Sequence, residues 1–431
     1  MNSLDRFREK LAPLNRGEAK FAKLDGLSLG WQVGVFAISV LAIYFRCPSD
    51  ISHAQFFAED GQAWYANAYN SGGLHALLLP CTNYLVIVQR LGAWLSLFFA
   101  FATAPLIMAL IGTVLQWLPV AILLSPRCRR WASLSLRVFF AAIYIAMPNA
   151  SEIHVVLTNS MWHLALAAIL LAFAAPPQSW VGRLFDTVIF ALISLTGPFG
   201  ILLAPVVLLF WYVRRQRWSL AAFGLLSLGG CVQIYVMHHY GNRASGPLGA
   251  TPGLFIRLTG GNVFVAGILG RLAWPKLLPT SLLLASFLAG LSIIIYFWWH
   301  SNLELRLFAA CCGGIFLAAL RSPLASANPF GLWYSLLETA GTRYWFFPTL
   351  LFLWACCWCS LSAPARPWRF AGALALLLLP VGIVHDWRYP SFPDEHLALY
   401  QERLQQAAPG QHIVIPIAPT PWTMELVKRS H

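Results

Sequence analysis

Long apolar runs recur along the chain, separated by short polar or basic stretches. Runs of about 17 to 25 residues are long enough to cross a hydrocarbon layer of roughly 30 Å as helices. No run shows the weaker ten-residue alternation of an outer-membrane barrel. The pattern therefore predicts an all-α, polytopic bundle of about eleven spans, near residues 28–45, 103–124, 134–148, 159–175, 184–196, 198–213, 218–237, 277–299, 307–320, 343–361 and 369–385.

Composition supports the same class. Hydrophobic residues make up 58% of the 431 residues and charged residues only 10%, which a single soluble core cannot accommodate. The formal net charge of +13 would suggest a nucleic-acid partner in a soluble protein. In a membrane protein, an excess of basic residues indicates instead how the chain is oriented across the membrane. We therefore predict no nucleic-acid partner.

The basic residues occupy alternate gaps between the predicted spans, as the positive-inside rule requires. The resulting inside set comprises residues 1–27, 127–130, 183, 214–217, 306, 366 and 369. Eleven spans then place the N-terminus in the cytoplasm and the C-terminus in the periplasm of a bacterial inner membrane. Residues 83–101 are apolar enough to cross, but a crossing there would invert the group at 127–130, so we predict a helix along the outer interface.

The predicted outer face carries most of the polar sequence. A first outer loop covers residues 46–102 and contains surface helices, a second covers 148–163, a third (238–276) is rich in Gly and Pro, and a fourth covers 321–343. We predict two units, a bundle with catalytic outer loops at 1–385 and a small periplasmic tail at 386–431. The tail sequence indicates a helix at 394–406 and one strand at 412–419, packed on the outer loops.

Glu59 and Asp60 are adjacent acids just after the first predicted span, in a chain with few others. Carboxylates near a membrane are costly unless they face water or serve chemistry. One interpretation is a catalytic base. The other is a helix N-terminal cap with first-turn acids, and the two are compatible.

Several short motifs, in order, are FFAEDGQAWYANAY, QRLGAW, LTNSMWHLAL, SLTGPFGILLAP and GTRYWFFP. Together with the predicted topology they resemble a bacterial group of GT-C class membrane glycosyltransferases, which use polyprenyl-phosphate sugars. The resemblance implies that Asp60 is the catalytic acid residue and that Arg343 binds phosphate. The chain departs from the class pattern in three ways: it has no Asp-X-Asp pair, it has Glu152 in place of an aspartate, and no large periplasmic domain follows the spans.

The residue types also fit this chemistry without the family. Sugar transfer from a lipid phosphate to a hydroxyl needs a base, cations for the leaving phosphate and aromatic faces for the sugar. The base is Asp60 or Glu59. The other candidates, all predicted at the outer face, are Arg343, Arg90, Arg271 and Lys276 for the donor phosphate, and Trp64, Trp162, Tyr344, Glu152, His154, Asn159 and His163 for sugar or acceptor.

No cofactor is predicted with certainty, and a divalent cation is the less favoured option. His154 and His163 lie near Glu152 in sequence, but a metal site needs converging ligands that this spacing does not guarantee. The predicted partners are a polyprenyl-phosphate-linked sugar, membrane lipid and a glycan, lipid or protein acceptor. A flippase or exporter of lipid-linked sugars and an O-antigen ligase or polymerase are the alternatives.

Cys47 and Cys81 both fall in the first outer loop, in an oxidising compartment. A disulfide would close the loop that holds the two acids. The alternative, which we favour, is a pair of free thiols.

Overall fold

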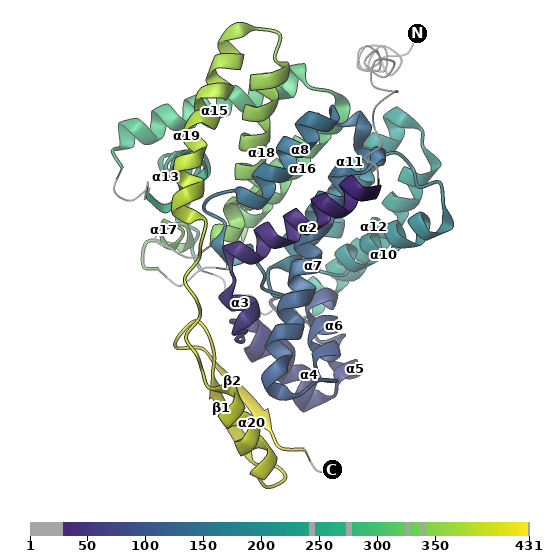
Figure 1. Cartoon of the computed structure of the whole chain (residues 1–431), viewed down its shortest axis with the longest axis vertical. Helices are drawn as coiled ribbons and strands as arrows, with labels where there is room; N and C mark the ends of the chain where they lie inside the picture. The colour runs from purple at the N-terminus through teal and green to yellow at the C-terminus, as the bar shows by residue number, and fades with distance from the viewer. Residues whose placement is uncertain (1–28, 241–245, 273–277, 325–327, 338–340, 430–431) are drawn as a thin grey trace.

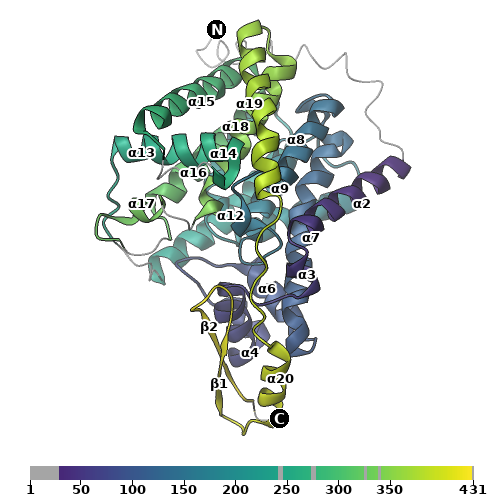
Figure 2. The same ribbon diagram turned by 60° about the vertical axis from the view of Figure 1, so that its left-hand side comes forward.

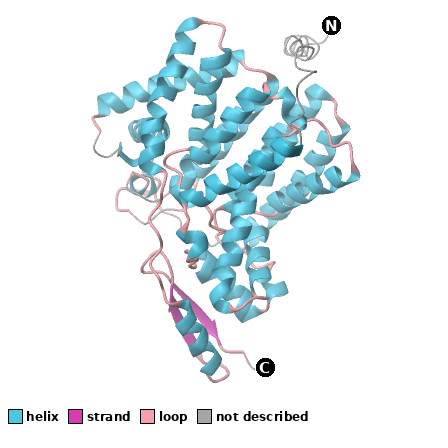
Figure 3. Cartoon of the chain, viewed as in Figure 1, coloured by secondary structure: helices cyan, strands magenta, loops and turns pink. Residues whose placement is uncertain are grey.

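A computed structural model describes residues 29–240, 246–272, 278–324, 328–337 and 341–429. The described chain is mostly helical, and its two strands both lie in the C-terminal tail (Figure 3). Seven helical segments are long and apolar enough to cross a membrane, which supports a multi-pass membrane protein. They are Phe101–Leu124 (which contains η4, Phe101–Thr103, and α7, Ala104–Leu124), α12 (Arg217–His239), Pro252–Leu269, α15 (Thr280–His300), α16 (Leu303–Arg321), α18 (Thr342–Ser362) and α19 (Arg366–Asp386).

Shorter helices complete the bundle (Figure 1). Four are apolar: α2 (Leu29–Arg46), α8 (Leu134–Ala146), α9 (Ser160–Ala172) and α11 (Phe199–Arg214). α10 (Trp180–Ser194) occupies the remaining predicted span and carries Arg183 and Asp186. Short connecting turns are η5 (Pro126–Arg130), η6 (Ser151–Ile153), η8 (Gly270–Leu272) and α17 (Leu332–Ser335).

The third outer loop was predicted without a helix, and this was wrong. Its centre forms α13 (Pro252–Leu258), the π-helical turn η7 (Thr259–Val265) and α14 (Ala266–Leu269). The glycines that suggested a loop permit close packing, because a Cβ on Gly260 would lie 2.3 Å from the backbone oxygen of Leu283 on α15.

Both ends of this segment lie at the same end of the bundle. The backbone N–H of Leu332 donates to the carbonyl of Pro247 (3.0 Å), which anchors the beginning near the loop between α16 and α18. The N–H of Arg271 donates to the carboxylate of Asp386 at the end of α19 (3.2 Å). The segment thus returns to the end where it began, and the alternation of the other helices is preserved.

One end of the bundle, here called the basic end, is joined by buried ion pairs. Arg127 makes a bidentate contact with Asp186 (2.8 and 2.6 Å), to which the Trp218 indole N–H also donates (2.9 Å). Arg214 pairs with Glu304 at 2.6 Å. Pairing offsets the cost of burying each charge, and it gathers helix ends that the charge pattern placed on one side.

The opposite end, here called the cavity end, is joined by Arg46. Its guanidinium donates to the carbonyls of Met147, after α8 (3.1 Å), and of Asp386, at the end of α19 (3.2 Å). The first outer loop continues from this end as α3 (Ser49–Ser52), the π-helix η3 (Asp60–Tyr65), α4 (Ala66–Ser71), α5 (Gly73–Ala76) and α6 (Ile87–Ser96).

α6 lies within residues 83–101, for which an interfacial helix was predicted. Its ten residues rise about 15 Å, roughly half of the hydrocarbon thickness, so α6 alone is too short to cross. Gln89 and Arg90 on α6 are buried against the protein, whereas Phe98 and Phe99 just beyond it are exposed. The polar side chains of α6 therefore face the interior of the protein.

The tail contains α20 (Leu397–Gln406) and an antiparallel hairpin of β1 (His412–Pro416) and β2 (Thr423–Val427). The sequence predicted the helix and the first strand but missed β2. Apolar tail residues share one hydrophobic cluster with Trp64 and Tyr65 of the first outer loop, among them Ile415, Ile417 and Met424. The tail thus packs on that loop, beside α4, as Figures 1 and 2 show.

Candidate functional site

A cavity of about 540 Å³ opens at the cavity end of the bundle. Its wall is formed by the first outer loop, the beginnings of α9, α11 and α18, and the ends of α12 and α16. Six of the predicted site residues line it: Glu59, Trp64, Asn159, Trp162, Arg343 and Tyr344. Folding thus brings together residues almost 300 positions apart in the chain.

Glu59 presents its carboxylate to the cavity beside Thr158. The Thr158 hydroxyl donates to Glu59 Oε2 (3.3 Å) and accepts from the indole N–H of Trp64 (3.2 Å). The amide of Gln89 donates to the Thr158 carbonyl (3.0 Å). Sequence analysis missed Thr158 and left Gln89 out of the site, because neither stands out in its local sequence.

Arg343, at the first turn of α18, supplies positive charge to the cavity. Its guanidinium donates to Glu152 Oε2 (3.2 Å) and to the Leu324 carbonyl (3.1 Å), and lies 4.9 Å from the centre of the Tyr344 ring. Glu152 also accepts the backbone N–H of Gly341 (2.7 Å). Glu152 therefore orients Arg343 and the beginning of α18, and it does not itself line the cavity.

Aromatic rings form another part of the cavity wall. Trp162 and Tyr344 lie 6.3 Å apart, nearly perpendicular, and Trp162 also packs on Phe199 at 5.7 Å. The Trp162 indole N–H is buried and has no hydrogen-bond partner within the described residues. An apolar face with a free donor is suited to a sugar ring and its hydroxyls.

Arg321, the last residue of α16, is a second guanidinium at the cavity. It was not among the predicted site residues, because a basic residue at the end of a span resembles an ordinary interfacial anchor. No ion pair joins it to another residue in the described ranges. The beginnings of α9, α11 and α18 and the ends of α12 and α16 all border the cavity, so their opposite partial charges offset one another and the two guanidinium groups are the main positive charges there.

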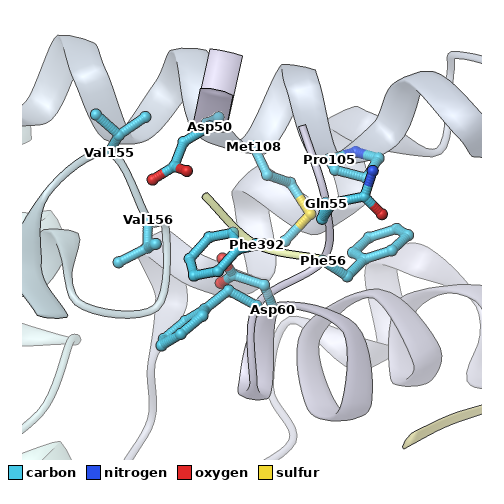
Figure 4. Close-up of a pocket in the computed structure, with 11 residues that line it drawn as sticks. Asp50, Gln55, Phe56, Asp60, Pro105, Met108, Val155, Val156 and Phe392 are labelled. Atoms are coloured by element: carbon cyan, nitrogen blue, oxygen red, sulfur yellow. The ribbon is translucent and has the colours of Figure 1, made fainter. Parts of the chain in front are cut away.

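Asp60, the favoured base in the sequence analysis, does not line this cavity. It lies in a separate void of about 10 Å³ with Asp50, Phe56, Val155 and Phe392 (Figure 4). Burial, followed by the charge of Glu59, raises the pKa of Asp60 well above its usual value, against backbone N–H groups of Leu157 and Thr158 that lower it. Because Glu59 lines the large cavity and Asp60 does not, the geometry favours Glu59 as the base.

The other predicted phosphate ligands lie elsewhere. Arg90 is buried with its guanidinium 5.2 Å from the Trp64 ring centre, and burial lowers its pKa. Arg271 lies beside Asp386 (Nε to Oδ1, 3.9 Å). Neither lines the cavity, and Lys276 falls outside the described residues. Arg90 packs against the ring of Trp64 and so supports a residue that lines the cavity.

His154 and His163 are buried in the bundle, away from the cavity lining. The two nitrogens of His163 contact the Tyr144 hydroxyl and the Ile153 carbonyl, both at 2.7 Å. His154 stacks on Tyr389 (5.4 Å) and contacts the Gln116 amide, and burial lowers its pKa. Within the described ranges no three His, Cys, Asp or Glu side chains are grouped to hold a metal ion.

Cys47 and Cys81 are both free thiols in the structure, the first buried and the second half-buried at the cavity. The favoured alternative of two unbonded cysteines therefore describes this structure.

Comparisons with protein-family models, with curated proteins and with solved structures find no match for this chain. The chemistry of the site is consequently argued from its own residues.

Proposed function

We propose that the protein is a membrane glycosyltransferase that moves a sugar from a polyprenyl-phosphate donor to an acceptor hydroxyl. The observation that carries the proposal is the single cavity that holds one carboxylate, two guanidinium groups and five aromatic rings at one end of a membrane bundle. Base, phosphate-binding cations and sugar-stacking faces are the three requirements of this reaction. The resemblance to the GT-C class points to the same reaction on the periplasmic face of a bacterial inner membrane.

In the proposed reaction Glu59 accepts the proton of the acceptor hydroxyl. The acceptor oxygen attacks the anomeric carbon as the bond from that carbon to the phosphate oxygen breaks. The bond electrons leave with the polyprenyl phosphate, whose charge Arg343 and Arg321 stabilise. One displacement inverts the anomeric centre and needs a single carboxylate at the cavity, as present.

The apolar part of the cavity suits a lipid-linked donor. Leu202, Met237 and Ile315 line it, and Met237 is also partly exposed on the surface of α12. A polyprenyl chain could therefore lie against apolar side chains while its phosphate meets the arginines. The acceptor, whether glycan, lipid or protein, and any divalent cation stay open.

A flippase of lipid-linked sugars is the competing function. Moving a charged headgroup through the membrane requires polar contacts along the path, including the midplane. The charged residues that line this cavity gather at one end of the bundle, which favours an enzyme over a flippase.

The test is release of polyprenyl phosphate by purified protein in liposomes supplied with a panel of polyprenyl-phosphate sugars and candidate acceptors. The enzyme should release polyprenyl phosphate, and Glu59→Gln should not. Movement of intact donor between leaflets without release would instead identify a flippase. Neither activity with any donor in the panel would contradict the proposed substrate class.

A further inference from the structure

The two adjacent acids face different cavities, and a strained turn directly precedes them. Ala58 has a positive φ of 44°, in the left-handed region that residues with a Cβ rarely adopt. Such a conformation persists only where neighbouring structure holds it. The next residues, Glu59 and Asp60, then enter the large cavity and the small void respectively.

The C-terminal tail supplies that support through the backbone. The N–H of Ala58 donates to the Ala418 carbonyl (2.5 Å), and the N–H of Ala418 donates to the Phe56 carbonyl (3.0 Å). The strained residue is therefore bracketed by two hydrogen bonds to one residue of the tail, more than 350 positions away.

Tail side chains hold the same turn from outside. Ile417 is 1% exposed, and a Cβ on Gly61 would lie 2.9 Å from its Cδ1 atom. Phe392 stacks on Phe57 with ring centres 5.0 Å apart, and it also borders the void that contains Asp60 (Figure 4). A Cβ at position 61 would therefore require Ile417 to shift.

The hairpin is itself anchored to the first outer loop. The Asn70 side chain donates to the Glu425 carbonyl and accepts the Val427 N–H, both at 2.9 Å. Arg429 donates to the Ala68 carbonyl (3.1 Å). These contacts fix the register of the hairpin against the loop, and hence the place of Ala418 beside Ala58.

We propose that the tail residues Ile417 and Ala418 are positioning residues that hold the Ala58 turn, so that Glu59 faces the large cavity and Asp60 stays buried. The inference rests on the proposed function only for what Glu59 does there. The positioning itself can be measured without any substrate.

The experiment compares the reactivity of Glu59→Cys and Asp60→Cys with a small charged thiol reagent in the full-length protein. Cys81→Ala and Cys231→Ala lower the background, since the other seven cysteines are buried. With the intact tail, position 59 should react at least about tenfold faster than position 60, which is reached only through local opening. Ile417→Ala should reduce this ratio to within about threefold for the same reason.

Val414→Ala is the matched control, because Val414 lies on the same hairpin but is 58% exposed. It should leave the ratio unchanged. Gly61→Ala places a methyl group against Ile417 and should lower the ratio as Ile417→Ala does. It therefore also serves as the test if Ile417→Ala does not fold. Ala58→Gly should restore most of the ratio in the Ile417→Ala protein, because glycine adopts positive φ without the steric cost.

An unchanged ratio in both Ile417→Ala and Gly61→Ala would overturn the proposal. A loss that Ala58→Gly fails to restore would also overturn it, since general loosening of the loop would then explain the result. These outcomes are independent of whether the protein cleaves polyprenyl-phosphate sugars.

Discussion

Neighbouring acidic side chains can face different spaces, because successive residues of a helical turn point in directions about 100° apart. Glu59 and Asp60 are adjacent in sequence, yet one lines a cavity of about 540 Å³ and the other a void of about 10 Å³. Glu59 therefore has the access to the large cavity that a general base needs, and Asp60 does not.

Glu59→Gln should reduce the rate of polyprenyl-phosphate release by about 100-fold or more, because the amide cannot take the acceptor proton. Asp60→Asn changes a buried side chain that does not line the large cavity and should stay within about tenfold of the unaltered protein, losing rate mainly through changes in local packing. Initial rates in liposomes measure both. If Asp60→Asn were the inactive variant and Glu59→Gln the active one, the base would be Asp60.

Arg343→Lys should weaken donor binding and slow the step that expels the phosphate, because an ammonium group cannot reproduce the contacts that the guanidinium makes to Glu152 and Leu324. We expect a loss of about 10-fold to 100-fold in kcat/KM for the donor. Arg271→Lys is the control, since Arg271 lies at the same end of the bundle but beside Asp386. Equal losses in the two variants would contradict a direct role for Arg343.

Asp50 should make stability depend on pH. Burial raises its pKa from the usual 3.8 to about 6, against hydrogen bonds from Ser49 and Cys47 that lower it. The folded state therefore holds the proton more tightly, so its stabilisation is complete below pH about 4 and is lost as the pH rises through about 6. Thermal midpoints in detergent should fall by about 2 to 5 °C between pH 4.5 and 7, and Asp50→Asn should flatten this slope. An unchanged slope would show that Asp50 titrates normally.

Elements with a strong apolar period were predicted from the sequence, whereas those defined by tertiary contacts were not. The eleven predicted spans all fall on helices, but only six of these helices are long and apolar enough to cross a membrane by themselves; the other five spans fall on the shorter helices α2, α8, α9, α10 and α11. The helical segment Pro252–Leu269 was missed because Gly260 and Gly261 read as loop residues, although close packing on α15 requires Gly260. β2 was missed because its hydrogen-bond partners, β1 and Asn70, lie elsewhere in the sequence.

The same limit applies to the site. The sequence predicted residues that face one side, but only six of the twelve candidates in the described ranges line the cavity. Glu152 and Arg90 support residues of the lining instead, and His154 and His163 hydrogen-bond or stack within the bundle. Facing one side is a property of topology, while sharing a cavity depends on packing between distant helices.

Gly260→Ala should destabilise the packing of α13, η7 and α14 against α15, because the added methyl group would lie 2.3 Å from the Leu283 oxygen. Overpacking of this kind costs about 1 to 3 kcal/mol. Gly253→Ala, on the same helical segment, has nothing within 4 Å and should leave stability unchanged or slightly raised. The thermal midpoint in detergent measures both, and an equal response would show that the close approach is not maintained.

At the scale of the molecule, contacts between helix ends agree with the alternation inferred from charge. Arg127, Asp186, Arg214 and Glu304 meet at the basic end, where the sequence placed the inner side. Arg46 and Asp386 meet at the cavity end together with the outer loops. Since Pro252–Leu269 begins and ends at the cavity end, it does not change this alternation.

Those contacts fix which ends lie together, and the positive-inside rule assigns the side. In intact cells, Ser71→Cys and Thr420→Cys, both exposed at the cavity end, should react with a membrane-impermeant thiol reagent. Arg215→Cys, exposed beyond α11 at the basic end, should react only after the membrane is permeabilised. Cys81→Ala and Cys231→Ala again remove the two reactive native thiols. The reverse pattern would place the cavity in the cytoplasm, where a cytoplasmic acceptor and donor would have to replace the periplasmic ones. Labelling of all three positions before permeabilisation would contradict the pairing of helix ends itself, because Arg215 and Ser71 would then share a side.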